Sequence, residues 1–151
     1  MAVEINADEV DPNTFDPREF NQQVIAEFRA NEGKVGGFFE GSDLVLLTTT
    51  GARSGEPRTS PVMYFEDGGK LYVIASMGGA DQNPAWYHNL RANPDVTAEI
   101  GTESFKAKAE VVEGTERDDL YAKVSAAKPQ FAEYQSKTTR VIPVVELRRA
   151  S

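Results

Sequence analysis

The sequence contains no cysteine and a single histidine, His88. Without cysteine, the chain has no disulfide, no thiolate nucleophile and no thiolate metal ligand. One histidine excludes the HExxH zinc motif, metal centres with several histidines and two-histidine facial triads. A serine hydrolase would have to use His88, and the GxSxG elbow of the α/β-hydrolases is missing. Hydrolytic and metal chemistry are therefore disfavoured, and we expect no bound metal.

Long apolar runs and an excess of positive charge are also missing. No run approaches the roughly 20 apolar residues that a membrane helix needs, and the acidic start, MAVEINADEVDPNTFDP, lacks a signal-peptide pattern. With 24 acidic against 16 basic residues, the net charge is −8. Such a surface repels a phosphate backbone, so we expect no nucleic-acid partner. An anionic ligand would have to be held by a local group of cations or backbone N–H groups.

The residues that are present fit one domain. A length of 151 residues and a hydrophobic content of 40% allow a single core. We expect residues 1–15 to be flexible, residues 16–32 to form a helix and residues 38–147 to form a cofactor-binding core. Asp16 suits the N-cap of that helix and Pro17 its first turn.

Six strands are expected in the rest of the chain. Apolar residues in continuous or alternating patterns, separated by hairpin-turn residues, predict strands at Leu44–Thr50, Thr59–Phe65, Lys70–Met77, Val96–Ile100, Phe105–Val111 and Val141–Leu147. Further helices are predicted over Pro84–Ala92, Thr115–Ala127 and Pro129–Lys137, and Thr115 resembles the start of a capping box. Hairpins dominate and no βαβ alternation appears. The predicted fold class is therefore α+β, a six-stranded antiparallel β-barrel with flanking helices.

The segment TTTGARSGEPR, between the first two expected strands, is the first candidate for a binding site. Gly51 and Gly55 allow close backbone approach or a positive φ. Arg53 offers a planar donor fork for phosphate or carboxylate, and Ser54 offers a hydroxyl. Arg58 starts the next strand and could face the same side. Composition alone also fits a plain hairpin loop with solvated arginines, whereas a P-loop is excluded because no Gly-Lys-Ser/Thr follows.

The segment ASMGGA at residues 75–80 is the second candidate, because it ends a buried strand just before a helix. N–H groups at the helix start could meet an anion or a carbonyl, and Ser76 can hydrogen-bond a ring heteroatom. Trp86 and Tyr87 could stack on a planar ligand. The alternative is that Trp86, Tyr87 and Leu90 simply pack the helix on the barrel.

A third candidate segment contains Phe131, Tyr134 and Arg140. Phe131 and Tyr134 are three residues apart and share a face of a predicted helix. Tyr134 could donate a proton or orient a carbonyl group. A tyrosine on a helix face can equally pack its ring and leave its hydroxyl in water.

Taken in order, these segments resemble the deazaflavin (F420)-dependent nitroreductases of actinobacteria, the Ddn-like family. The matching stretches, within about Phe38 to Leu147, are LLTTTGARSGEPR, SPVMY, DGGKLYVIASMGGADQNPAWYHNLRANPDV and FAEYQSKTTRVIPVVEL. The resemblance implies a split β-barrel of the flavin-reductase type and the coenzyme F420. It also implies hydride transfer from the reduced deazaflavin to a quinone-like or nitroaromatic acceptor.

The resemblance assigns roles to individual residues. It implies that the cofactor's phosphate and tail lie at Thr50, Gly51, Ala52, Arg53, Ser54, Gly55 and Arg58. It places the ring near Pro61, Met63, Ala75, Ser76, Met77, Gly78 and Gly79. The acceptor pocket would be lined by Trp86, Phe131 and Tyr134, and the catalytic residues that hydrogen-bond the reduced product would be Tyr134 and Ser76.

Two other functions stay open at the level of sequence. One is an FMN-binding split-barrel reductase, and the other is a non-catalytic module that binds the deazaflavin or a lipid-like ligand. Sequence does not identify the physiological acceptor. The expected location is the cytoplasm. A homodimer is one option, and a peripheral membrane contact through the Phe38-Phe39 pair and the N-terminal helix is another.

Overall fold

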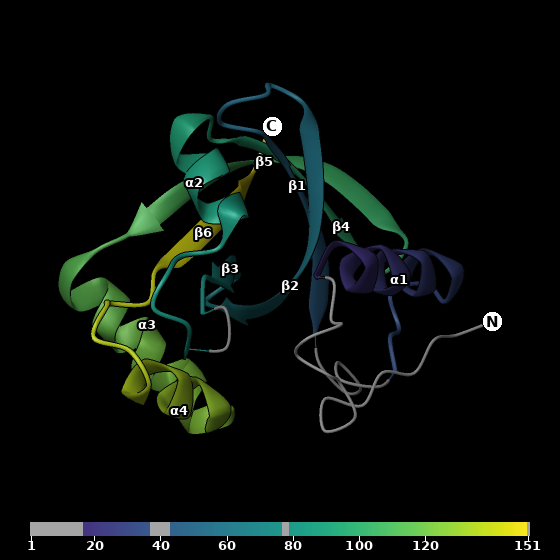
Figure 1. Ribbon diagram of the computed structural model, residues 1–151. Helices are drawn as coiled ribbons and strands as arrows, with labels where there is room; N and C mark the ends of the chain where they lie inside the picture. The colour runs from purple at the N-terminus through teal and green to yellow at the C-terminus, as the bar shows by residue number, and fades with distance from the viewer. Residues whose placement is uncertain (1–16, 37–42, 77–78, 151) are drawn as a thin grey trace.

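The structure is a computed structural model that describes residues 17–36, 43–76 and 79–150. In these residues six antiparallel strands form a closed barrel in the order β1-β2-β3-β6-β5-β4 (Figure 1). The strands are β1 (Leu44–Thr50), β2 (Pro57–Asp67), β3 (Lys70–Ile74), β4 (Asp95–Ile100), β5 (Glu103–Val112) and β6 (Val144–Arg149). The helices are α1 (Pro17–Ala30), α2 (Ala85–Ala92), α3 (Gly114–Ala127) and α4 (Gln130–Ser136). Within the described ranges, no helix has the length and apolar character needed to span a membrane.

Small side chains inside the barrel leave room for the aromatic residues of α2. Strand β5 alternates between inward residues such as Ala107 and exposed residues such as Lys106, which is the period-2 pattern of a half-buried strand. Ala98 and Ala107 are almost fully buried in the same cluster as Trp86 and Tyr87. Helix α2 therefore closes one end of the barrel, and in Figure 1 it lies beside the β1–β2 turn.

Helices also cover the outside of the barrel. Helix α1 buries Phe28 against Leu44 and Leu46, so the first half of β1 is buried on both faces. Helices α3 and α4 pack side by side at the lower left of Figure 1, and their residues cluster with Ile74 and Val144 at the ends of β3 and β6. The strands therefore contribute one face to the core inside the barrel and the other face to the clusters beneath the helices.

The predicted barrel is confirmed, with differences at the ends of elements. Strand β3 stops at Ile74 instead of Met77, and β6 begins at Val144 instead of Val141. The predicted capping box at Thr115 is wrong, because the N-cap of α3 is Glu113 and its side chain makes no capping hydrogen bond. Residues 1–15, Asp16 and the Phe38-Phe39 pair lie outside the described residues.

Candidate functional site

The loop between β1 and β2 is a closed turn held by its own backbone. The Gly51 N–H donates to the Glu56 carbonyl at 2.8 Å, and the Gly55 N–H donates to the Gly51 carbonyl at 2.9 Å. The Ser54 hydroxyl accepts from the Glu56 N–H at 3.2 Å. A Cβ at Gly51 would overlap the Ser54 hydroxyl oxygen and come within 3.3 Å of the Glu56 carbonyl oxygen, so a side chain there would force Ser54 to move.

A buried asparagine on α2 fastens this loop to the barrel. Asn89 is only 9% exposed. Its Oδ1 accepts from the Ala52 N–H at 3.0 Å, and its Nδ2 donates to Thr49 Oγ1 at 3.2 Å. Because both bonds cross almost forty residues of sequence, no local pattern marks Asn89 as part of the site. It fixes where the loop presents its donors.

The loop exposes cations and N–H groups that have few partners. Arg53 is exposed and has no hydrogen bond or ion pair with any described residue. In the described part of the chain Arg58 is paired only with Glu56, at 3.6 Å between Nη2 and Oε2, and both side chains are more than half exposed. Such a surface pair is weak and can exchange for another anion. Among the described residues, the N–H groups of Arg53 and Ser54 also have no acceptor.

The second candidate segment follows the end of β3. Ala75 is fully buried and Ser76 is 8% exposed. The Ala75 N–H donates to the Pro143 carbonyl at 3.0 Å, and the Ser76 carbonyl accepts from the Gly79 N–H at 2.9 Å. The Ser76 hydroxyl has no hydrogen bond with the described residues. Met77 and Gly78 lie outside the described part of the chain.

Gly79 lies against the backbone of α4, which joins the second and third candidate segments. A Cβ at Gly79 would come within 2.8 Å of the Tyr134 carbonyl oxygen and 3.1 Å of the Tyr134 Cα. Met63 on the outer face of β2 and Tyr134 both pack against the cluster that contains Phe131. The structure therefore brings the end of β3, the middle of β2 and α4 together.

Replacing Gly79 by alanine is expected to destabilise the protein more than replacing Gly69. The two φ angles are similar, +85° and +79°, so either alanine would carry a left-handed strain of about 1–2 kcal/mol. Only at Gly79 would the new methyl group meet backbone atoms, and overpacking adds about 1–3 kcal/mol. Denaturant unfolding of both variants measures the difference, and equal losses would contradict the close contact between Gly79 and α4.

Tyr134 is half-buried on α4 and its ring is held by Phe131. The two rings are 5.6 Å apart between centroids and nearly perpendicular, at 89°. Burial raises the pKa of the Tyr134 hydroxyl above its ordinary value, and the neighbouring Glu133 carboxylate adds to this increase. The hydroxyl is therefore protonated at neutral pH and available as a donor.

Two of the predicted pocket residues are largely buried. Trp86 is 8% exposed and belongs to the core inside the barrel, whereas Phe131 is 2% exposed and packs outside it. The packing interpretation of Trp86 therefore accounts for its position. Of the predicted acceptor-pocket residues, Tyr134 has the most exposed side chain.

The remaining predicted cofactor residues follow the surface between these segments. Their exposure falls from the loop toward β3: exposed at Ala52, Arg53, Ser54, Gly55 and Arg58, half-buried at Thr50, Gly51, Pro61 and Met63, and buried at Ala75, Ser76 and Gly79. Pro61 and Met63 are two residues apart on β2 and so share its outer face. This fall in residue exposure along the surface suits a ligand whose tail is solvated and whose ring is more enclosed.

A cavity of about 890 Å³ lies elsewhere, between the end of α1 and the ends of β1, β2 and β4. None of the predicted site residues that the structure describes lines it. Its charged lining consists of Glu27, Glu32, Asp43 and Lys34, which gives an excess of negative charge. An anionic ligand is repelled by such a surface. The charge distribution therefore favours the β1–β2 loop for an anion.

Comparisons with known proteins show the family of the chain. The sequence model of the family described as F420H(2)-dependent quinone reductase matches residues 20–148. The F420H(2)-dependent quinone reductase Rv1261c of Mycobacterium tuberculosis H37Rv is 38% identical over 130 residues, which cover 82% of this chain and 86% of that protein.

Two solved structures show the same relationship. One, described as an F420-H2 dependent reductase, is 42% identical with a TM-score of 0.63 and covers 70% of this chain and 94% of its own. Another, described as a domain-swapped dimer, is 36% identical with a TM-score of 0.65 and covers 88% of this chain and all of its own. The chain belongs to the F420H2-dependent quinone reductase family, and it is an oxidoreductase that depends on the coenzyme F420.

Proposed function

We propose that this protein transfers a hydride from F420H2 to a quinone at a site formed by the β1–β2 loop, the end of β3 and helix α4. The observation that carries the proposal is the donor set of the loop. In a chain of net charge −8, Arg53 and Arg58 stand beside two N–H groups that have no acceptor among the described residues. These donors suit the phosphate and carboxylates of the F420 tail.

Close contacts at two glycines also shape the proposed site. Gly51 leaves room for the Ser54 hydroxyl inside the closed loop, where it accepts from the Glu56 N–H, while Arg53 is exposed. Gly79 allows α4 to lie directly on the strand end. A side chain at Gly79 would displace the helix, so this contact in particular supports a preformed site.

Several residues are proposed to hold the ring and the acceptor. Pro61 and Met63 would lie along one side of the ring, and the Ser76 hydroxyl would meet one of its heteroatoms. F420 in its reduced form supplies the hydride. The chain then has to orient the acceptor, exclude water and donate a hydrogen bond to the acceptor oxygen as charge develops there. We assign that donation to the protonated Tyr134 hydroxyl, and no covalent nucleophile is needed.

The acceptor class can be tested by mixing the protein with F420H2 and a small panel of acceptors. We expect menadione to oxidise F420H2 rapidly in a reaction that depends on the protein. The return of F420 absorbance measures this oxidation. A protein that binds F420H2 without oxidising it on addition of any quinone would instead be the non-catalytic module. Faster turnover with FMN as the bound cofactor would favour the FMN-dependent reductase.

A homodimer is a further part of the proposal. It is supported by the relative described as a domain-swapped dimer, whose full length aligns with this chain. The mass in solution, measured by light scattering, decides between monomer and dimer. The single-domain organisation, a nitroaromatic acceptor, the cytoplasmic location and a peripheral membrane contact stay predictions.

A further inference from the structure

Arg140 connects the end of β3 to the segment that follows α4. Its guanidinium donates four hydrogen bonds and makes no ion pair with a described residue. Nε donates to the Ala80 carbonyl at 2.7 Å, and Nη2 donates to the Ser76 carbonyl at 2.8 Å. Nη1 donates to the Ala75 carbonyl at 3.1 Å and to Asn83 Oδ1 at 2.8 Å. One side chain thus bonds to acceptors between Ala75, at the end of β3, and Asn83, just before α2.

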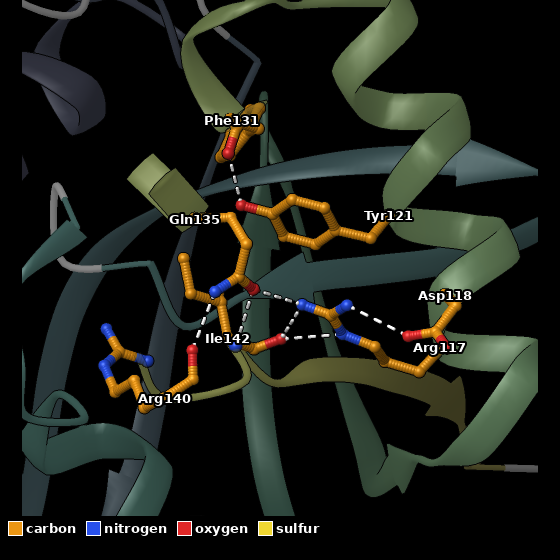
Figure 2. Close-up of polar contacts among 7 residues, drawn as sticks. All are labelled: Arg117, Asp118, Tyr121, Phe131, Gln135, Arg140 and Ile142. Atoms are coloured by element: carbon orange, nitrogen blue, oxygen red, sulfur yellow. Dashed lines mark hydrogen bonds and ion pairs between the residues drawn. The ribbon is translucent and has the colours of Figure 1, made fainter. Parts of the chain in front are cut away.

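The backbone of Arg140 is itself held by the residue next to Tyr134. Gln135 Nε2 donates to the Arg140 carbonyl at 2.7 Å, as Figure 2 shows. Gln135 Oε1 accepts from Arg117 Nη2 at 2.7 Å and from the Ile142 N–H at 3.1 Å. The side-chain amide of Gln135 therefore holds the segment that follows α4 at two points, the Arg140 carbonyl and the Ile142 N–H.

Arg117 anchors this arrangement on α3. Its Nε and Nη2 donate to the Ile142 carbonyl at 3.0 and 2.8 Å, and its guanidinium lies 4.4 Å from the Tyr121 ring centroid. The Tyr121 hydroxyl donates to the Phe131 carbonyl at 2.5 Å, which ties the start of α4 to the same helix (Figure 2). Helix α4 is thus held by α3 at its first and last turns.

We propose that Arg140 is a positioning residue that sets the distance between Ser76 and Tyr134. The inference rests on the proposed function, in which Ser76 meets the ring and Tyr134 meets the acceptor. Hydride transfer requires the donor and acceptor carbons to be in near contact, and a misplacement of about 1 Å can cost 10²-fold in rate. A planar fork with four acceptors around it fixes a loop in a way that the point charge of a lysine does not.

The test compares Arg140→Ala and Arg140→Lys with a control, Arg29→Ala. Arg29 is an exposed arginine on α1 that pairs with Glu99, away from the site. We expect kcat for menadione to fall about 10²-fold in Arg140→Ala, and the Kd of F420 to rise less, because the defect lies mainly in alignment. Added guanidinium at low millimolar concentration should restore at least a tenth of the lost activity in Arg140→Ala and have no effect on the control. A kcat within twofold of the wild-type value, or a loss that guanidinium does not relieve, would overturn the proposal.

Hydrogen exchange at the Gly79 amide, measured without cofactor, separates this inference from the proposed function. This amide donates to Ser76 and reports on the loop that Arg140 holds. We expect faster exchange in Arg140→Lys and in Arg140→Ala than in the wild type or the control. If Arg140→Ala does not fold, Arg140→Lys decides: a lowered kcat with faster exchange supports the role, and wild-type values of both overturn it. If the wild-type protein does not reduce quinones, the proposed function fails, while the exchange experiment still judges Arg140.

Discussion

Replacing Arg53 and Arg58 together by alanine is expected to weaken F420 binding by about 10²-fold or more. A hydrogen bond to a charged group contributes about 1.5–3 kcal/mol, and 1.4 kcal/mol corresponds to a factor of ten in affinity. Both side chains are exposed, so we take the lower end of that range for each. The chain has a net charge of −8, and its overall field cannot compensate for the loss.

The measurement is a fluorescence titration with F420 at several salt concentrations. Arg91→Ala on the exposed face of α2 and Arg29→Ala on α1 are matched controls, since each removes one exposed arginine outside the loop. We expect the affinity of the wild type to fall with added salt, and that of the double variant to depend on salt much less. An affinity of the double variant within threefold of the wild type would show that the tail is held elsewhere.

Tyr134→Phe is expected to lower kcat with quinones by about 10²-fold, which is the usual scale of a lost proton donor. The change keeps the ring and its perpendicular contact with Phe131 and removes only the hydroxyl. F420 affinity should stay within twofold of the wild-type value, because the proposed cofactor donors lie on other elements. Tyr87→Phe is the matched control, because Tyr87 packs in the barrel core.

The pH profile gives a second measurement on Tyr134. Burial raises its pKa, and an unperturbed tyrosine titrates near about pH 10. The midpoint for loss of the proton from Tyr134 therefore lies above that pH, and we expect this residue to leave kcat flat between about pH 7 and 9. Equal losses of kcat and of F420 affinity in Tyr134→Phe would show that the hydroxyl acts on the cofactor instead of the acceptor.

The barrel could be predicted because turn residues and alternating apolar residues mark its strands within short stretches of sequence. The Asp67-Gly68-Gly69 turn joins β2 and β3 with both glycines at positive φ, and the alternation in β5 fixes which residues face inward. The pattern also favoured a strand at Val141–Pro143, which was wrong. Val141 is 67% exposed, and the N–H and carbonyl of Ile142 bond to Gln135 and Arg117. Side chains of Arg117 and Gln135, on α3 and α4, therefore take the backbone bonds of Ile142 that a strand would have used.

Because sequence signals are local, they identify only part of the candidate site. The loop arginines and Ser76 lie in segments whose glycines and polar residues suggest binding, so sequence could select them. Asn89 gave no such signal, and Arg140 stood in a candidate segment without an assigned role. Each acts through bonds to residues 37 to 65 positions away. A motif can therefore indicate which groups meet a ligand, whereas the residues that hold those groups in place emerge only from the folded chain.

The most direct test of the account is a parallel titration of the wild-type protein with F420 and FMN, followed by mixing the F420H2 complex with menadione. We predict that F420 binds at least about tenfold more tightly than FMN, a difference of about 1.4 kcal/mol, since the loop has donors for an extended anionic tail. We also predict that F420H2 is oxidised in the complex at a rate that depends on the quinone. Tighter binding of FMN, or F420H2 that stays reduced in the presence of quinone, would contradict it.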